Sequence, residues 1–235
     1  MSEPSLWRRL KASFAASAGQ VVFGMEDGTV SIFGLVFGVA ATTNDQAAVL
    51  VAGASGAVAA AVSMMAGTYL DVETSRDQAR LIASRIDADL RNNSATVVDG
   101  ITHRLTAAGL SSKQAARFGS LLSSQPAVLK SLATALTTSS APDANQSPLV
   151  QSLWMLVADF LAAAIPILPF AFLPVPEGRV VSGAVTTMLL VGLGIGRGLI
   201  GGRNILRTIM ETVAIGVAAA LAGVAIGVWI SHLSS

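Results

Sequence analysis

Residues 21–40 read VVFGMEDGTVSIFGLVFGVA, and this stretch decides the class of fold. It is apolar and long enough for a helix that crosses a bilayer, which takes about 20 residues. It nevertheless carries two adjacent acids, Glu26 and Asp27. A carboxylate inside a membrane span usually faces a bundle interior or a wet cavity, where it marks an ion or proton path. The stretch therefore indicates a membrane protein and favours a transporter.

The composition of the whole chain points the same way. Of its 235 residues, 52% are hydrophobic and 12% are charged, whereas soluble domains carry about 25% charged residues. The absence of cysteine excludes disulfides and thiolate metal sites, so a metal ion would be bound by oxygen, thioether or imidazole. The net charge of +1 shows no basic excess of the kind that binds nucleic acid, and we expect no nucleic-acid partner.

Five stretches are apolar and long enough to span a bilayer, and turn-forming residues separate them. We therefore predict an all-α membrane protein of five transmembrane helices, with a small helical cytoplasmic insert between the second and third. The predicted spans cover roughly residues 20–42, 47–70, 149–172, 179–201 and 208–231.

These spans divide the chain into four parts. We expect a cytoplasmic N-terminal segment (1–19), transmembrane helices 1–2 (20–70), the insert with its linker (71–148) and transmembrane helices 3–5 (149–235). The N-terminal segment has apolar residues at helical spacing beside Arg8, Arg9 and Lys11, which suits either a short amphipathic helix at the headgroups or a frayed basic tail. In the insert we predict that the second span continues to Arg91, followed by helices over 95–108, 112–124 and 126–137 and a linker over 137–148.

The placement of the cations predicts the orientation. If the N-terminus is cytoplasmic, all 15 Lys and Arg residues except Arg179 fall on the cytoplasmic side, as the positive-inside rule requires. The C-terminus then lies on the opposite side. The pattern does not distinguish a bacterial-type plasma membrane from an organelle membrane.

Asp27 and Met64 are the candidate metal ligands. They lie 15 and 17 residues from the predicted outer ends of the first two spans, or about 22 and 26 Å along the helices. We therefore expect a carboxylate oxygen and a thioether sulfur to face one cavity. This mixed pair suits a transition metal such as Fe²⁺ better than Mg²⁺ or Ca²⁺.

Several other residues are candidates for a proton or accessory path. Glu26 points about 100° away from Asp27, toward headgroups or a second helix. Asp159 is either a proton carrier near mid-membrane or a buried partner for a hydroxyl of the fifth span. Glu211 has Arg207 four residues earlier, which predicts an ion pair. The complete set of accessory candidates is Glu26, Ser31, Met65 and Asp159.

Pairs of glycine four residues apart recur in the spans. They include Gly24 with Gly28, Gly34 with Gly38, and Gly223 with Gly227. Such pairs let helices approach closely. They are compatible with tight packing inside one chain and with a dimer.

Four motifs together resemble the vacuolar iron transporter family. They are DGTVSIFGLV at 27–36, AVSMMAGTYL at 61–70, SRD at 75–77 and IPILPF at 165–170. The resemblance implies a five-span homodimeric exporter that moves ferrous iron and related divalent ions out of the cytosol in exchange for protons. It also implies that Asp27 and Met64 are the translocation ligands, and that the insert corresponds to a glutamate-rich cytoplasmic metal-binding domain.

The insert departs from that family pattern. Thr68 and Ala79 stand where the family typically has glutamate, and Gly56 stands where some relatives have one. Between residues 74 and 147 the cations outnumber the acids by eight to five, whereas a multi-ion carboxylate site requires concentrated negative charge. We expect that the insert keeps its helices and loses most of that metal site.

The function predicted from the sequence is proton-coupled export of a divalent metal ion, with Fe²⁺ or an Mn²⁺-like ion as cargo. The expected partners are the ion, protons, the lipid bilayer and a second copy of the chain. We predict no catalytic residues and no cofactor, since both histidines lie outside the spans. Two alternatives stay open: a nontransporting scaffold or partner- and lipid-binding module, and a transporter of a different cargo.

Overall fold

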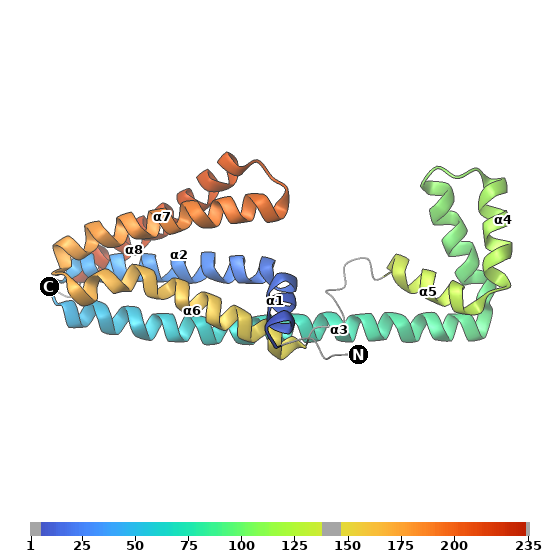
Figure 1. Ribbon diagram of the computed structural model, residues 1–235, viewed down its shortest axis with the longest axis horizontal. Coiled ribbons are helices and arrows are strands. Elements are labelled where there is room, and N and C mark those ends of the chain that lie inside the picture. The colour runs from blue at the N-terminus through green and yellow to red at the C-terminus, as the bar shows by residue number, and fades with distance from the viewer. Residues whose placement is uncertain (1–5, 138–146, 234–235) are drawn as a thin grey trace. The chain divides into compact units, whose positions relative to one another are not determined.

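The computed structural model describes residues 6–137 and 147–233. Within these ranges the regular structure is entirely helical, as predicted. Five of the helices, α2, α3, α6, α7 and α8, are long and apolar enough to cross a membrane. The helices are α1 (Leu6–Ala16), α2 (Ala18–Thr42), α3 (Gln46–Ala107), α4 (Ser112–Ser123), α5 (Pro126–Thr137), α6 (Pro148–Phe172), α7 (Val175–Gly201) and α8 (Ile205–Leu233) (Figure 1).

Short turns connect the long helices where the sequence predicts breaks. Before α3, the Asp45 carboxylate accepts the backbone N–H of Ala47 at 2.9 Å, which satisfies a donor that a helix start leaves free. After α7, Gly202 adopts a φ of 60°, the left-handed conformation that ends many helices. Helices α7 and α8 begin a few residues before the predicted spans, and each of these added first turns contains one charged residue, Glu177 in α7 and Arg207 in α8.

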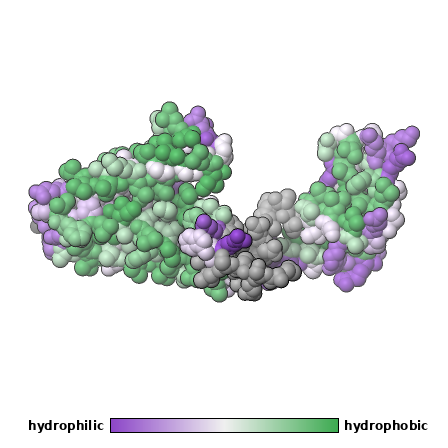
Figure 2. Space-filling view, viewed as in Figure 1, coloured by the Kyte–Doolittle hydropathy of each residue, from purple (hydrophilic) through white to green (hydrophobic). Residues whose placement is uncertain are grey.

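The chain forms two compact units, and each is described by itself. Among the described residues, unit 1 comprises 6–69 and 147–233, and unit 2 comprises 70–137. In unit 1, α2 packs against α6, α7 and α8 (Figure 1). The face of unit 1 in Figure 2 is mainly hydrophobic, which suits a surface in contact with lipid. Its buried core consists of Ile32, Val36, Ala40, Val49, Ala57, Ala163, Phe170 and Val175.

Glycines bring α2 and α8 into direct backbone contact. A Cβ atom on Gly38 would lie 2.6 Å from the carbonyl oxygen of Gly223, and one on Gly34 would lie 2.8 Å from that of Ala219. Neither backbone oxygen can move aside as a flexible side chain would. The predicted close approach therefore occurs inside one chain, between the first and last spans.

Two prolines interrupt α6 near its C-terminal end, at positions 166 and 169. Side chains of neighbouring helices satisfy the carbonyls of this stretch. The Ser182 hydroxyl donates to the Pro166 carbonyl at 2.7 Å, and the Gln46 amide donates to the Phe170 carbonyl at 2.6 Å. These bonds remove the cost of leaving backbone oxygens unpaired in an apolar interior.

Unit 2 is a small helical bundle. The C-terminal part of α3 packs with α4 and α5 around a core of its own, and Asn93 breaks the helical conformation of α3 with φ −158° and ψ 84°, where the sequence predicts a division. Ser111 and Gln114 form a capping box at the start of α4. Lys130 pairs with Asp87 at 2.7 Å. The predicted linker lies largely outside the described residues. The core consists of Ile86, Val98, Ile101, Leu122, Leu129 and Ala133.

The N-terminal segment contains the predicted short helix, α1. Phe14 meets Trp154 of α6 edge to face, with 5.3 Å between ring centroids. The indole N–H of Trp154 donates to the Ser13 hydroxyl at 3.1 Å. Trp7 stays exposed, with the Lys11 ammonium 5.3 Å from its ring centroid. An exposed aromatic beside a cation is typical of helices at the membrane interface.

Candidate functional site

A cavity of about 350 Å³ lies against α2, and Asp27 forms part of its wall. Asp27 is half-buried. Helices α7 and α8 each contribute one residue to the wall, and the remainder comes from α2. The lining combines apolar residues with three charged side chains: Gly19, Val22, Phe23, Val30 and Ile215 with Glu26, Asp27 and Arg197.

The local sequence explains why the acids face this cavity. Gly24 and Gly28 share one face of α2, and α6 packs directly on that face through Met155 and Asp159. At about 100° per residue, Glu26 then lies on the opposite face and Asp27 to one side. The glycine pair thus orients the acidic pair.

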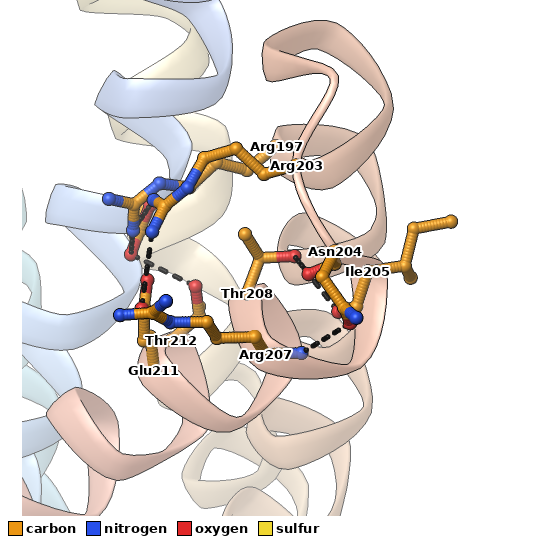
Figure 3. A network of polar contacts seen from close by, with 9 residues as sticks. Arg197, Arg203, Asn204, Ile205, Arg207, Thr208, Glu211 and Thr212 are labelled. Carbon is orange, nitrogen blue, oxygen red and sulfur yellow. Dashed lines mark hydrogen bonds and ion pairs between the residues drawn. The ribbon is translucent and has the colours of Figure 1, made fainter.

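Glu26 is held by an ion pair and a hydrogen bond (Figure 3). Arg197 Nη1 lies 3.1 Å from Glu26 Oε1 and 3.4 Å from Oε2. The Thr212 hydroxyl of α8 donates to Oε1 at 3.2 Å. Of the two orientations predicted for Glu26, the one toward a second helix is correct. The ion pair compensates Glu26 and leaves Asp27 as the acid that faces the cavity without an arginine.

A second ionic cluster lies at the turn between α7 and α8 (Figure 3). Arg207 Nε is 3.0 Å from Glu211 Oε1, which confirms the predicted pair, and Arg203 adds a contact of 3.2 Å to the same oxygen. Asn204 Oδ1 accepts the Arg207 backbone N–H at 3.2 Å at the start of α8. All three charged side chains are partly exposed. The cluster joins the two sides of the turn, and none of its residues lines the Asp27 cavity.

Asp159 is fully buried in α6 against the backbone of Gly28. Among the described residues, neither of its carboxyl oxygens has a hydrogen-bond partner. The predicted pairing with a hydroxyl of the fifth span is wrong. The Thr212 hydroxyl donates to Glu26, and the Thr208 hydroxyl donates to backbone carbonyls one turn earlier in α8.

The remaining predicted residues do not line the Asp27 cavity. Met64 and Met65 are half-buried on α3, and Ser31 is exposed on α2. The structure therefore brings Asp27 together with Glu26 and Arg197, and it does not bring Met64 to this cavity. Helix rise predicts a similar depth in the membrane for Asp27 and Met64, but depth does not determine how each helix is rotated about its own axis.

The contacts of α3 with α2 show how that rotation is set. Side chains of α2 contact α3 at Gly53 and Gly56, through Val36 and through Leu35 with Ile32. Met64 lies two turns further along α3.

Within residues 6–137 and 147–233, no group of three or more His, Cys, Asp and Glu side chains is placed to hold a metal ion.

Sequence reasoning missed Arg197 as a site residue. It treated this arginine only as one of the cytoplasmic cations. The available signal was an arginine inside the fourth predicted span, four residues before its end, because a cation at such a position usually pairs with an acid or reaches toward the interface.

Comparison with known proteins identifies the fold family. No curated protein matches the chain. A model of the VIT family matches residues 18–228, from the first residue of α2 to the last turns of α8. This match covers all five candidate spans and the residues of the Asp27 cavity. The chain therefore belongs to the VIT family, the vacuolar iron transporter family of membrane proteins.

Proposed function

We propose that the protein is a proton-coupled exporter of divalent metal ions, with Fe²⁺ or an Mn²⁺-like ion as its cargo. The observation that carries this proposal is the carboxylate of Asp27, which belongs to an apolar helix and lines a cavity between that helix, α7 and α8. Keeping an acid in a membrane span costs free energy, so the acids found in such spans usually have a function. Membership of the VIT family supports metal transport. In the proposed mechanism Asp27 binds the ion and takes up a proton when the ion leaves.

We further propose Met64 as the soft ligand, with Met65, Ser31 and Glu26 as accessory groups. Met64 is half-buried on α3, outside the Asp27 cavity. Large apolar residues on the same span, including Val51, Val58 and Val62, are exposed in the single chain. Such a surface suits lipid or a second copy, and it supports a homodimer in which α3 of one protomer approaches its partner.

The proposed direction of transport is out of the cytosol. The distribution of cations supports it, because the positive-inside rule favours a cytosolic N-terminus, a cytosolic insert and a cytosolic turn between α7 and α8. Arg197 then marks the cytosolic end of the pathway. The cavity beside Asp27 is the proposed entry for the ion.

Flux measurements on sealed proteoliposomes test the proposal. We expect uptake of Fe²⁺, Mn²⁺ and Co²⁺ and no uptake of Mg²⁺ or Ca²⁺, because a site with a thioether favours softer ions. Met64→Leu should lower Fe²⁺ flux by about tenfold or more, because even changes to groups that only support a metal ligand cost about that much. Met188→Leu, at an exposed methionine of α7, serves as the matched control. Absence of flux for every ion would contradict the proposal and favour a nontransporting module.

Asp159 is the proposed proton carrier. A carboxyl group without a partner in an apolar interior is costly in its charged form, so exchange of its proton requires a change in its surroundings. Its packing against Gly28, next to Asp27, links such a change to the cavity.

Asp159→Asn should preserve the fold and abolish the coupling, because asparagine keeps the shape and carries no exchangeable charge. One proton moving down a gradient of about one pH unit corresponds to about a tenfold concentration ratio. In wild type we therefore expect that gradient to raise Mn²⁺ accumulation by up to about tenfold per coupled proton, and in Asp159→Asn we expect no increase. Thr186→Val, which alters another buried side chain with an unpartnered oxygen, is the control and should retain the increase. An equal increase in Asp159→Asn would remove Asp159 from the proton path.

A further inference from the structure

The cavity beside Asp27 contains its own cation. Arg197 lines the cavity together with Glu26 and Asp27. In this volume of about 350 Å³, two carboxylates therefore face one guanidinium. The Glu26 side chain is 13% exposed and that of Arg197 is 38% exposed, so the arginine is the more solvent-exposed member of the pair.

The geometry of the ion pair makes it displaceable. Both short contacts to Glu26 come from one nitrogen, Nη1. The strongest arginine–carboxylate pairs instead use two nitrogens in parallel. The long side chain of arginine can also lie along apolar surface while its head moves toward water. Arg197 can therefore leave Glu26 without a change in the backbone of α7.

Glu26 keeps a partner when the arginine leaves. The Thr212 hydroxyl donates to Oε1 from α8, and this bond holds the carboxylate in place from a different helix. The second oxygen, Oε2, then loses its contact with Arg197, and Glu26 remains in the wall of the cavity beside Asp27. Two carboxylates on consecutive residues of α2 would offer oxygen ligands of total charge −2 to a divalent ion, which neutralises them.

We propose that Glu26 is a second carboxylate ligand for the cargo and that Arg197 is a tethered cation that occupies Glu26 when no ion is bound. A divalent cation displaces Arg197 on entry, and Arg197 displaces the cation from Glu26 on release. The inference deepens the proposed function and rests on it. Its physical consequence is a site that binds metal weakly and releases it rapidly, because an internal competitor is always present.

Four variants test the competition, with Mn²⁺ as the probe. Arg197→Gln should lower the apparent KM for Mn²⁺ by about tenfold, the lower end of the range for groups that act on a ligand, and should lower kcat because release slows. Glu26→Gln should raise KM. In the double variant, KM should equal that of Glu26→Gln, because the arginine acts only through that carboxylate. Arg203→Gln, which alters a neighbouring arginine outside the cavity, is the matched control and should not change KM.

Arg197→Lys covers the case in which Arg197→Gln does not fold. Lysine retains the charge and pairs less well with a carboxylate, so KM should fall in the same direction by a smaller factor. Calorimetric titration of the purified protein with Mn²⁺ gives a readout independent of flux, and the dissociation constant should follow the same order.

The outcomes separate the two proposals. Absence of wild-type flux and of Mn²⁺ binding contradicts the proposed function itself. Wild-type flux with unchanged KM in Arg197→Gln and Arg197→Lys contradicts only the tethered cation. A purely structural ion pair predicts a third pattern: each single variant loses folded protein at constant KM, and the double variant recovers it. That pattern would also overturn the inference.

Discussion

Asp27→Asn is expected to reduce metal flux to the level of empty liposomes. Asparagine fills the same volume and can occupy the same position in the cavity wall, so the fold should persist. It removes the negative charge that attracts a divalent cation and the group that accepts a proton in its place. Since changes to groups that merely support a ligand cost about 10- to 100-fold in metal affinity, loss of the ligand itself should cost more than about 100-fold.

The matched control for this prediction is Asp45→Asn. Asp45 lies in the exposed turn before α3, where asparagine caps a helix as well as aspartate does. Flux of Mn²⁺ into proteoliposomes, measured at equal protein content for both variants, checks the prediction. Undiminished flux in Asp27→Asn would remove Asp27 from the transport mechanism and require another explanation for an acid in the first span.

Gly38→Leu should prevent the correct assembly of unit 1. Even the first side-chain atom at this position would lie 2.6 Å from the carbonyl oxygen of Gly223, well inside van der Waals contact. Overpacking a core commonly costs about 1–3 kcal/mol and occasionally more, and here the obstacle is the backbone of α8. We expect a loss of at least about 3 kcal/mol, seen as aggregation in size-exclusion chromatography and a lower thermal midpoint.

Gly192→Leu provides the comparison for this helix contact. Gly192 lies in α7, and a Cβ atom there meets nothing within 4 Å. Both variants add the same apolar side chain and replace glycine inside a long helix, so propensity and hydrophobicity cancel between them. Equal thermal midpoints for the two variants would show that the contact between α2 and α8 contributes nothing special to stability.

The long helices were predictable because span length and turn chemistry are local properties. A run of about 20 apolar residues is sufficient to predict a span. Asp45 caps the start of α3 and Gly202 ends α7, both for reasons visible in the sequence. The division of α3 near Asn93 and the capping box at Ser111 also depend on local sequence.

The rotation of each helix about its axis was not predictable, and the candidate site depends on it. The sequence gives Asp27 and Met64 a common depth. Contacts between helices decide the direction of each side chain. The contacts that orient Glu26 and Asp27 involve residues 130 or more positions apart, as with Gly28 and Asp159 or Glu26 and Arg197. For this reason the contact of Arg197 with Glu26 appears only in the folded chain. The Asp159 carboxyl likewise lacks the hydrogen bond to a hydroxyl that was expected for it.

The glycine crossing of α2 and α8 restricts how this protein can change shape. At Gly34, Gly38 and Gly223 the two backbones touch, so axial sliding would drive larger neighbours into the opposite helix. The crossing therefore opposes axial translation of α2 against α8. Because Glu26 and Asp27 lie two to three turns from Gly34 and Gly38 along the same α2, this restriction also holds the two acids at a fixed level beside α8.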